Sequence, residues 1–253
     1  MTVTSTDIAI IGMSARYTGC PNLKRYWERI RDGEECIRFV EDDELDANRH
    51  LIGHPRFVRV AAPIDGYDMF DPGLFGMTKR EAELADPHHR VFLEGAWNAF
   101  EDAGYDVSTL EDVVCVYAGK RESGYVSRLG QPLLVALVSS LPEAERVYIP
   151  FSNHLTSHVS HALGLGGESI EVSAACTTGI VAAHLGIQSI LTGQSDLALV
   201  GGVSVLMPHI SGYLYDPNCY RFSEDGRCYS FDDRAHGVMI ASGCGVLLLK
   251  KLD

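Results

Sequence analysis

Short apolar runs alternate along this sequence with longer segments of helical periodicity, and this alternation constrains the fold more than any other feature. The apolar runs are rich in β-branched residues and predict buried strands at residues 8–12, 113–117, 169–172 and 197–201, with one or two more within residues 238–250. Strands that alternate with helices usually form parallel sheets covered by helices. We therefore expect an α/β fold with a mainly parallel sheet.

The helical segments carry start and stop signals. Asn22 can cap a helix with Leu23, Trp27 and Ile30 on one face, and Gly33 can end it. A second helical region should be interrupted before Pro87, because proline disfavours helix in the residue that precedes it. Expected helices cover residues 23–32, 78–85, 88–103, 153–163 and 176–191; residues 36–77 and 208–234 are expected to be irregular, and residues 122–147 have no clear pattern.

Composition excludes several classes of protein. A 253-residue chain with 46% hydrophobic and 22% charged residues is typical of a globular domain. A formal charge of −13 disfavours nucleic acid as a partner. The seven cysteines include no CxxC pair, which favours reduced thiols over a disulfide framework or a zinc ribbon. Secretory and membrane-spanning signals are absent, so we expect a cytoplasmic protein without membrane contact.

Cys176 is the principal candidate for chemistry. It lies among small residues between a predicted strand and a predicted helix. Small neighbours permit the tight turn that presents a nucleophile, and a helix N-terminus favours a thiolate and can stabilise an oxyanion. The alternative is a small buried cysteine packed among alanines.

Four blocks of the sequence resemble the β-ketoacyl synthases, the condensing enzymes of fatty-acid and polyketide biosynthesis. The third contains Cys176, and His184 also fits its pattern. The blocks are residues 8–13 with Tyr26 and Trp27; residues 70–76, 80–83, 86–90 and 101–105; residues 175–179; and residues 225–232 with Arg234 and residues 245–252.

This resemblance implies the N-terminal half of a thiolase-like α/β fold, in which helices sandwich a mixed sheet, over residues 1–253. It also implies that Cys176 is the acyl-thioester nucleophile, with its backbone N–H in an oxyanion hole. The acyl group would come from the phosphopantetheine of an acyl carrier protein and be condensed with a malonyl-type extender. The family implies a homodimer, no directly bound cofactor and no metal.

The resemblance also implies two catalytic histidines, in an acidic-His-Gly-Thr and an Asn-Ile-Gly-His segment, and neither segment occurs here. Because both belong to the family's C-terminal half, we expect a split ketosynthase whose second chain supplies them. A non-elongating acyltransferase that uses the same cysteine is an alternative. A non-catalytic scaffold half of a synthase complex is another.

Some residues depart from the family pattern and leave the substrate class open. Ser173–Ala174 and residues 177–179 flank Cys176 in a manner nearer to the fatty-acid type, and residues 241–244 replace an acidic Gly-Glu-Gly segment. His158 stands where the family commonly has arginine.

Three other groups of residues carry weaker signals. His154, His158 and His161 would share a helix face, as metal ligands can, although a polar interface is the more economical interpretation. His88 and His89 are interpreted as structural, and the glycines at 164, 166 and 167 do not form a nucleotide loop because a strand follows them. Lys24, Arg25, Arg29 and Arg31 form either a docking patch for an acidic carrier protein or a solvated face.

Overall fold

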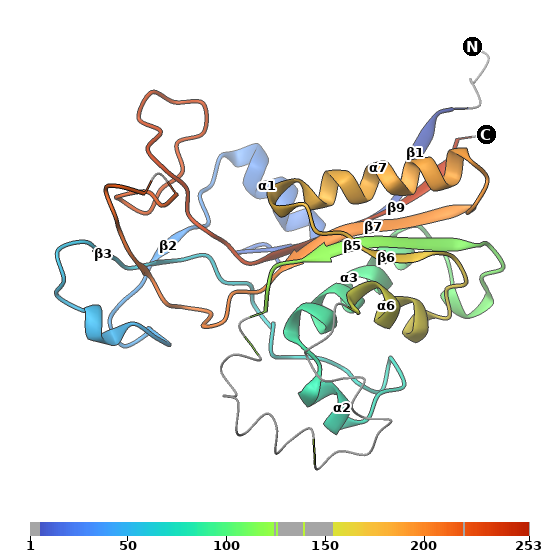
Figure 1. The fold of residues 1–253 in the computed structure, drawn as a ribbon, viewed down its shortest axis with the longest axis horizontal. Coiled ribbons are helices and arrows are strands. Elements are labelled where there is room, and N and C mark those ends of the chain that lie inside the picture. Colours follow the sequence, from blue (N-terminus) through green and yellow to red (C-terminus); the bar gives the residue numbers. More distant parts are fainter. Residues whose placement is uncertain (1–5, 124, 126–138, 140–153, 220, 253) are drawn as a thin grey trace.

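The protein is described by a computed structural model that covers residues 6–123, 125, 139, 154–219 and 221–252. A five-stranded sheet forms its centre (Figure 1). The strands of this sheet are β1 (Ile8–Tyr17), β5 (Val114–Lys120), β6 (Ser169–Glu171), β7 (Leu197–Ser204) and β9 (Gly243–Lys251). All five lie within or close to the apolar runs that predicted them, and most extend further.

The sheet is mixed, with strand order β1-β9-β7-β5-β6. Strand β5 is parallel to β6 and to β7, whereas β9 is antiparallel to both β7 and β1. The expectation of a mainly parallel sheet was therefore wrong for two of the pairings. The described residues between β7 and β9 contain no crossover helix, and Ser204 at the end of β7 pairs with Gly243 at the start of β9. Because the chain re-enters the sheet at the end where β7 leaves it, β9 runs antiparallel to β7.

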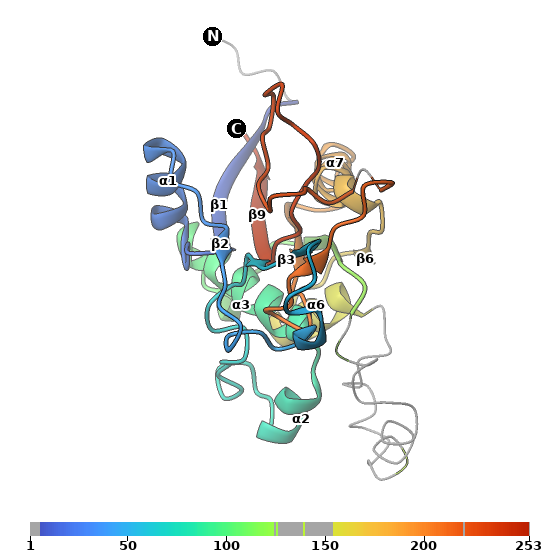
Figure 2. The same ribbon diagram turned by 90° about the vertical axis from the view of Figure 1, so that its left-hand side faces the viewer.

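Helices cover both faces of this sheet. Helices α3 and α6 pack on one face and α7 packs on the other (Figures 1 and 2). The helices are α1 (Leu23–Asp32), α2 (Lys79–Leu84), α3 (Pro87–Asp102), α6 (Leu155–Leu163) and α7 (Thr178–Leu191). In the described part of the chain, no helix combines the length and the apolar character needed to cross a lipid bilayer.

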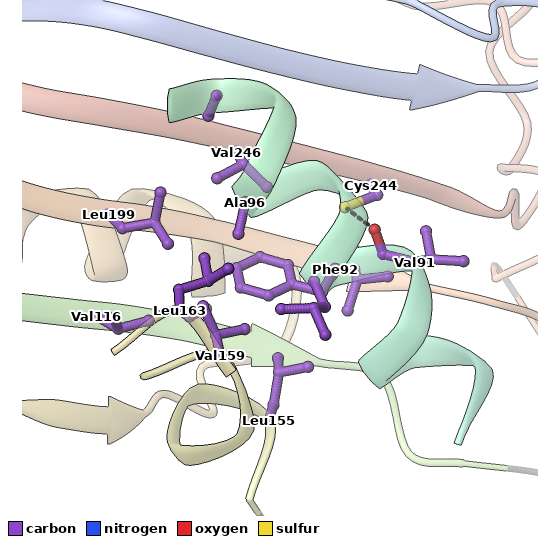
Figure 3. Close-up of a cluster of buried hydrophobic side chains, with 14 of the residues drawn as sticks. Val91, Phe92, Ala96, Val116, Leu155, Val159, Leu163, Leu199, Cys244 and Val246 are labelled. Carbon is purple, nitrogen blue, oxygen red and sulfur yellow. Dashed lines mark hydrogen bonds between the residues drawn. The ribbon is translucent and has the colours of Figure 1, made fainter. Parts of the chain in front are cut away.

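The larger core lies between the sheet and the pair α3 and α6. Phe92 of α3 is completely buried there, next to side chains of α6 and of strands β5 and β7 (Figure 3). The Cys244 thiol of β9 donates to the Val91 carbonyl across the same core at 3.9 Å. Apolar side chains on both faces explain why β5, which is buried along most of its length, is a nearly continuous apolar run.

The helix boundaries follow the expected signals. The Asn22 side chain accepts a hydrogen bond from the Arg25 N–H at 2.9 Å, and Gly33 ends α1 with a φ of 67°. Helix α3 begins at Pro87, as the interruption predicted. However, the apolar face of α1 is not buried, because Trp27 is 61% exposed and Ile30 is 53% exposed.

The segment 36–77 is less irregular than expected. Strand β2 (Arg38–Phe39) pairs with β4 (Val60–Ala61), and β3 (Phe57–Val58) pairs with β8 (Tyr213–Leu214). These two-residue strands are too short to give a periodic sequence signal. Among the described residues, short 3-10 turns occur at η1 (Arg49–Leu51), η2 (Val107–Thr109) and η4 (Ala175–Thr177). The segment 122–147, which has no clear sequence pattern, lies almost entirely outside the described residues.

Candidate active site

Cys176 lies in the η4 turn that joins strand β6 to helix α7. The preceding residue, Ala175, has a φ of 48°, in the left-handed region that residues with a Cβ atom rarely adopt. Such a conformation costs about 1–3 kcal/mol and persists only where its surroundings hold it. The strand-to-helix turn at Cys176 is therefore sharp and strained. The expected helix start at Cys176 was two residues early.

Two threonine hydroxyls hold this turn in place. The Ala174 N–H donates to the Thr178 hydroxyl oxygen at 3.0 Å, and that hydroxyl donates to the Ala175 carbonyl at 2.8 Å. The Thr177 hydroxyl donates to the Ala174 carbonyl at 2.7 Å. These bonds fix the backbone on both sides of Cys176 and leave its thiol outside the network.

Cys176 opens into a cavity of about 1010 Å³. The cavity lies at the carboxyl ends of the parallel strands β5, β6 and β7, the edge at which ligands bind in open α/β sheets. Because Cys176 precedes α7, it also faces the positive end of that helix dipole. The lining residues are Tyr17, residues 119–123, Ser173, Ala175, Cys176, Thr178, Gly179, residues 202–204, Arg221, residues 241–243 and Gly245.

The environments of the other cysteines separate them from Cys176. Burial raises the pKa of the Cys20 and Cys115 thiols and raises the pKa of Cys244 to about 12. Cys219 and Cys228 are exposed and Cys36 is partly exposed, but none of the three lines the cavity. In this chain Cys176 is exposed and is not packed among alanines in a core.

Comparisons with known proteins identify the family. The model of the "Beta-ketoacyl synthase, N-terminal domain" matches residues 5–253. The chain belongs to the β-ketoacyl synthase family. Its relatives include a phenolphthiocerol/phthiocerol polyketide synthase of Mycobacterium tuberculosis, 36% identical over 100% of this chain and 17% of that protein. The polyketide synthase PksN of Bacillus subtilis is 35% identical over 97% of this chain and 4% of its own length.

Solved ketosynthase structures share the fold of this domain. Ketosynthase twelve of the bacillaene polyketide synthase from Bacillus amyloliquefaciens superimposes with a TM-score of 0.84 at 33% identity, over 96% of this chain and 43% of that chain. The module 1 ketosynthase of the bacillaene synthase from Bacillus amyloliquefaciens FZB42 gives a TM-score of 0.81 at 32% identity, over 98% of this chain and 40% of that chain. The chain thus spans less than half of the ketosynthases that it resembles.

The ten histidines of this chain do not gather around Cys176, and none of them lines the cavity. His184, which fits the family pattern, is exposed on α7 and does not line the cavity. His158 packs edge-on against the buried His89, with ring centroids 4.8 Å apart, whereas His154 and His161 are exposed. In the residues that the structure describes, no three His, Cys, Asp or Glu side chains could together hold a metal ion.

His89 of α3 is nearly completely buried. Burial, together with the neighbouring His158, lowers the pKa of His89 to about 3. The ring is therefore neutral at physiological pH. The charge of Lys120, which lines the Cys176 cavity, also contributes to this lowering of the His89 pKa.

Asp86 and His88 form a buried pair at the start of α3. The Asp86 carboxylate accepts the His88 backbone N–H at 2.8 Å and lies 2.7 Å from His88 Nδ1. The Val205 N–H donates to His88 Nε2 at 3.0 Å, so the ring proton resides on Nδ1 and is donated to Asp86. Burial raises the pKa of Asp86, but the hydrogen bonds from His88 and Ser123 and the charge interaction with His88 together outweigh burial and leave the pKa below its usual range. The pair joins α3 to the end of β7 and is structural, as interpreted.

The basic residues of α1 are largely neutralised. Arg25 lies 3.1 Å from Glu28, Arg29 contacts Glu34, and Arg31 lies 2.8 Å from its neighbour Asp32. These pairs favour a solvated face over a strongly basic patch.

The cationic residues that line the Cys176 cavity were not among the predicted site residues. Lys120 and Arg121 follow a predicted strand, so the convergence of strand ends could have indicated them. Arg221 lies in a loop that carries no comparable signal.

Proposed function

We propose that this chain supplies the nucleophile of a polyketide-type ketosynthase, and that Cys176 receives an acyl group from the phosphopantetheine of an acyl carrier protein. The observation that carries the proposal is the exposed Cys176 thiol, presented by a strained turn into a large cavity at the head of α7. A thioester on the enzyme keeps the acyl group in place while one carrier is exchanged for the next.

The proposed acylation is an exchange of thioesters. The Cys176 thiolate attacks the carbonyl carbon of the donor thioester, and a sulfur–carbon bond forms. The resulting oxyanion accepts a hydrogen bond from the Cys176 backbone N–H at the turn before α7. When the carbonyl re-forms, the bond to the carrier sulfur breaks, and the departing thiolate takes up the proton that Cys176 released. No cofactor is consumed.

The proposed condensation uses this acyl-enzyme. A malonyl-type extender loses CO₂, and the electron pair of the broken bond forms an enolate. The enolate carbon attacks the acyl carbonyl, a carbon–carbon bond forms, and the Cys176 thiolate departs. The enolate needs hydrogen-bond donors. We propose that these are the two histidines of the family's C-terminal half, which pairs with residues 1–253 and completes a dimeric ketosynthase.

The character of α7 supports a complementary half. Apart from His184 and Gln188, the exposed side of this helix is largely apolar, and Ile180 is 76% and Leu191 38% exposed. A helix that is apolar around most of its circumference is normally buried on all sides. Within the described residues, α7 packs against the sheet on one side only. We propose that the family's C-terminal half supplies the missing cover; this chain spans 43% of the solved ketosynthase, which leaves room for such a half.

Incubation with an acyl carrier protein donor, with and without the C-terminal half, tests the proposal by intact-protein mass spectrometry. We expect an acyl adduct on this chain, and a β-ketoacyl product when a malonyl-type extender is added. An adduct without product in the completed unit would indicate acyl transfer alone. No adduct under any condition would indicate a scaffold and overturn the proposal.

A further inference from the structure

The Cys176 cavity carries a charge opposite to that of the chain. The formal net charge of the chain is −13, yet three of the four charged residues that line the cavity are cationic. They are Lys120, Arg121 and Arg221, and the single acid is Glu122. A cavity that only held hydrocarbon would gain nothing from guanidinium groups on its wall, because their desolvation is costly.

Two of these cations are held by fixed backbone from different parts of the fold. The Arg121 N–H donates to the Val203 carbonyl of β7 at 3.1 Å, directly after β5 ends. Arg221 accepts a hydrogen bond from the Val238 N–H through its carbonyl, also at 3.1 Å. Both side chains are exposed. Residues far apart in sequence thus place two guanidinium groups on one cavity wall.

The two arginines also differ from Lys120 in their partners. Lys120 Nζ lies 3.9 Å from the Glu171 carboxylate, which offsets its charge. Within the described ranges, neither Arg121 nor Arg221 forms an ion pair with an acidic side chain; Arg221 stacks over Phe222, with its guanidinium carbon 5.6 Å from the ring centroid. Their charges are therefore available to a ligand in the cavity.

We propose that Arg121 and Arg221 select an acyl group that bears a carboxylate, and so determine which thioester acylates Cys176. This inference rests on the proposed function of Cys176. A guanidinium group binds a carboxylate through two parallel, charge-assisted hydrogen bonds, which gives orientation as well as affinity. The carboxylate takes no part in the bonds that form and break at Cys176; it positions the acyl chain in the cavity.

The test compares two thioesters of N-acetylcysteamine, glutaryl and glutaramoyl, which have similar shape but differ by one negative charge. The rate of acylation is measured in the ketosynthase assembled from this chain and its C-terminal half, without extender. We expect glutaryl to react about tenfold faster than glutaramoyl. Arg121→Gln and Arg221→Gln should each reduce this ratio several-fold. Arg56→Gln, at an exposed arginine that does not line the cavity, should leave the ratio unchanged.

A second arm separates an acyl carboxylate from a carrier phosphate. The glutaramoyl group is presented on pantetheine and on phosphopantetheine. If the arginine variants slow only the phosphorylated donor, the carrier phosphate is the ligand and the proposal is overturned. Equal rates for glutaryl and glutaramoyl in the unmodified protein would overturn it as well.

A binding measurement keeps this inference separate from the proposed function. A non-transferable amide analogue of glutaryl-pantetheine is titrated into Cys176→Ala, with and without Arg221→Gln. Arginine-dependent binding without acylation of the parent protein would overturn the proposed function and retain the carboxylate site. Acylation of the parent protein without arginine-dependent binding would overturn the carboxylate site and retain the proposed function.

Discussion

Gly119 and Thr178 lie so close together that no side chain fits between them. A Cβ atom on Gly119 would come 2.3 Å from Thr178 Cγ2 and 2.0 Å from the Val172 carbonyl oxygen. Gly119 is near the end of β5, and Thr178 holds the strained turn at Cys176. The end of β5 therefore packs directly against the turn that presents the candidate nucleophile, and only glycine permits this approach.

Substitution of this glycine should damage both the fold and the site. Gly119→Ala forces the Cys176 turn away from β5, and we expect a loss of about 1–3 kcal/mol in the free energy of unfolding. Urea unfolding measures the loss, and the rate of Cys176 acylation should fall with it. Gly166→Ala is the matched control, because a Cβ atom there meets nothing within 4 Å. Equal stability of the two variants would contradict this packing.

The buried His89 predicts a pH dependence of stability. Its pKa is about 3 in the folded chain and about 6.5 in the unfolded chain, so the unfolded state binds more protons between these values. Stability should therefore fall as the pH decreases below about 6.5. Between about pH 7.5 and pH 5 we expect the parent protein to lose about 2 kcal/mol more than His89→Gln, measured by urea unfolding. If the free energy of unfolding of the two proteins changed equally with pH, His89 would not be the group whose pKa is lowered by folding.

The Asp86–His88 pair predicts a costly substitution at the start of α3. Asp86→Ala removes the helix cap and leaves the buried His88 Nδ1–H without its acceptor. We therefore expect the free energy of unfolding to fall by about 3 kcal/mol. Asp86→Asn keeps an acceptor oxygen and should lose less. Because the pKa of Asp86 is depressed, the carboxylate's advantage over Asn is present above its ordinary pKa of 3.8 and is lost at lower pH.

Thermal unfolding of both variants checks this order of stability. Asp106→Ala serves as a control, because Asp106 makes a similar cap to the Ser108 N–H on the exposed η2 turn. We expect Asp106→Ala to lower the free energy of unfolding by no more than about 1 kcal/mol. A larger loss at Asp106 than at Asp86 would mean that burial of the pair contributes nothing.

The exposed face of α7 predicts a defect in assembly without a defect in folding. Ile180→Glu places a charge on a side chain that is 76% exposed in this chain, so its own stability should change by less than about 0.5 kcal/mol. Co-purification with the C-terminal half should be lost, because the glutamate would be buried there without a partner. Gln188→Glu, on an already polar exposed residue of the same helix, should weaken assembly less. Normal co-purification of Ile180→Glu would argue against this interface.

Local sequence signals predicted most of the elements but not how the strands pair. Asn22 and Gly33 bound α1 as expected because capping depends on neighbouring residues. The antiparallel insertion of β9 between β1 and β7 depends on contacts between chain ends, such as Ile8 with Lys251, which no local pattern encodes.

The candidate site was predictable in part. The strand–cysteine–helix order at Cys176 predicted the turn, yet the positive φ fell on Ala175, a residue type that gives no such signal. The contact between His89 and His158 and the convergence of Arg121 with Arg221 arise only when separate elements pack together.

The most direct test of this account is to locate the acyl group among the seven cysteines. After incubation with an acyl carrier protein donor and the C-terminal half, the chain is digested and the thioester-bearing peptide is identified by mass spectrometry. We predict that the acyl group resides on Cys176, that Cys176→Ala abolishes the adduct, and that a variant with Cys219→Ala and Cys228→Ala retains it. An adduct that persists in Cys176→Ala would contradict the assignment of Cys176 as the acylated nucleophile.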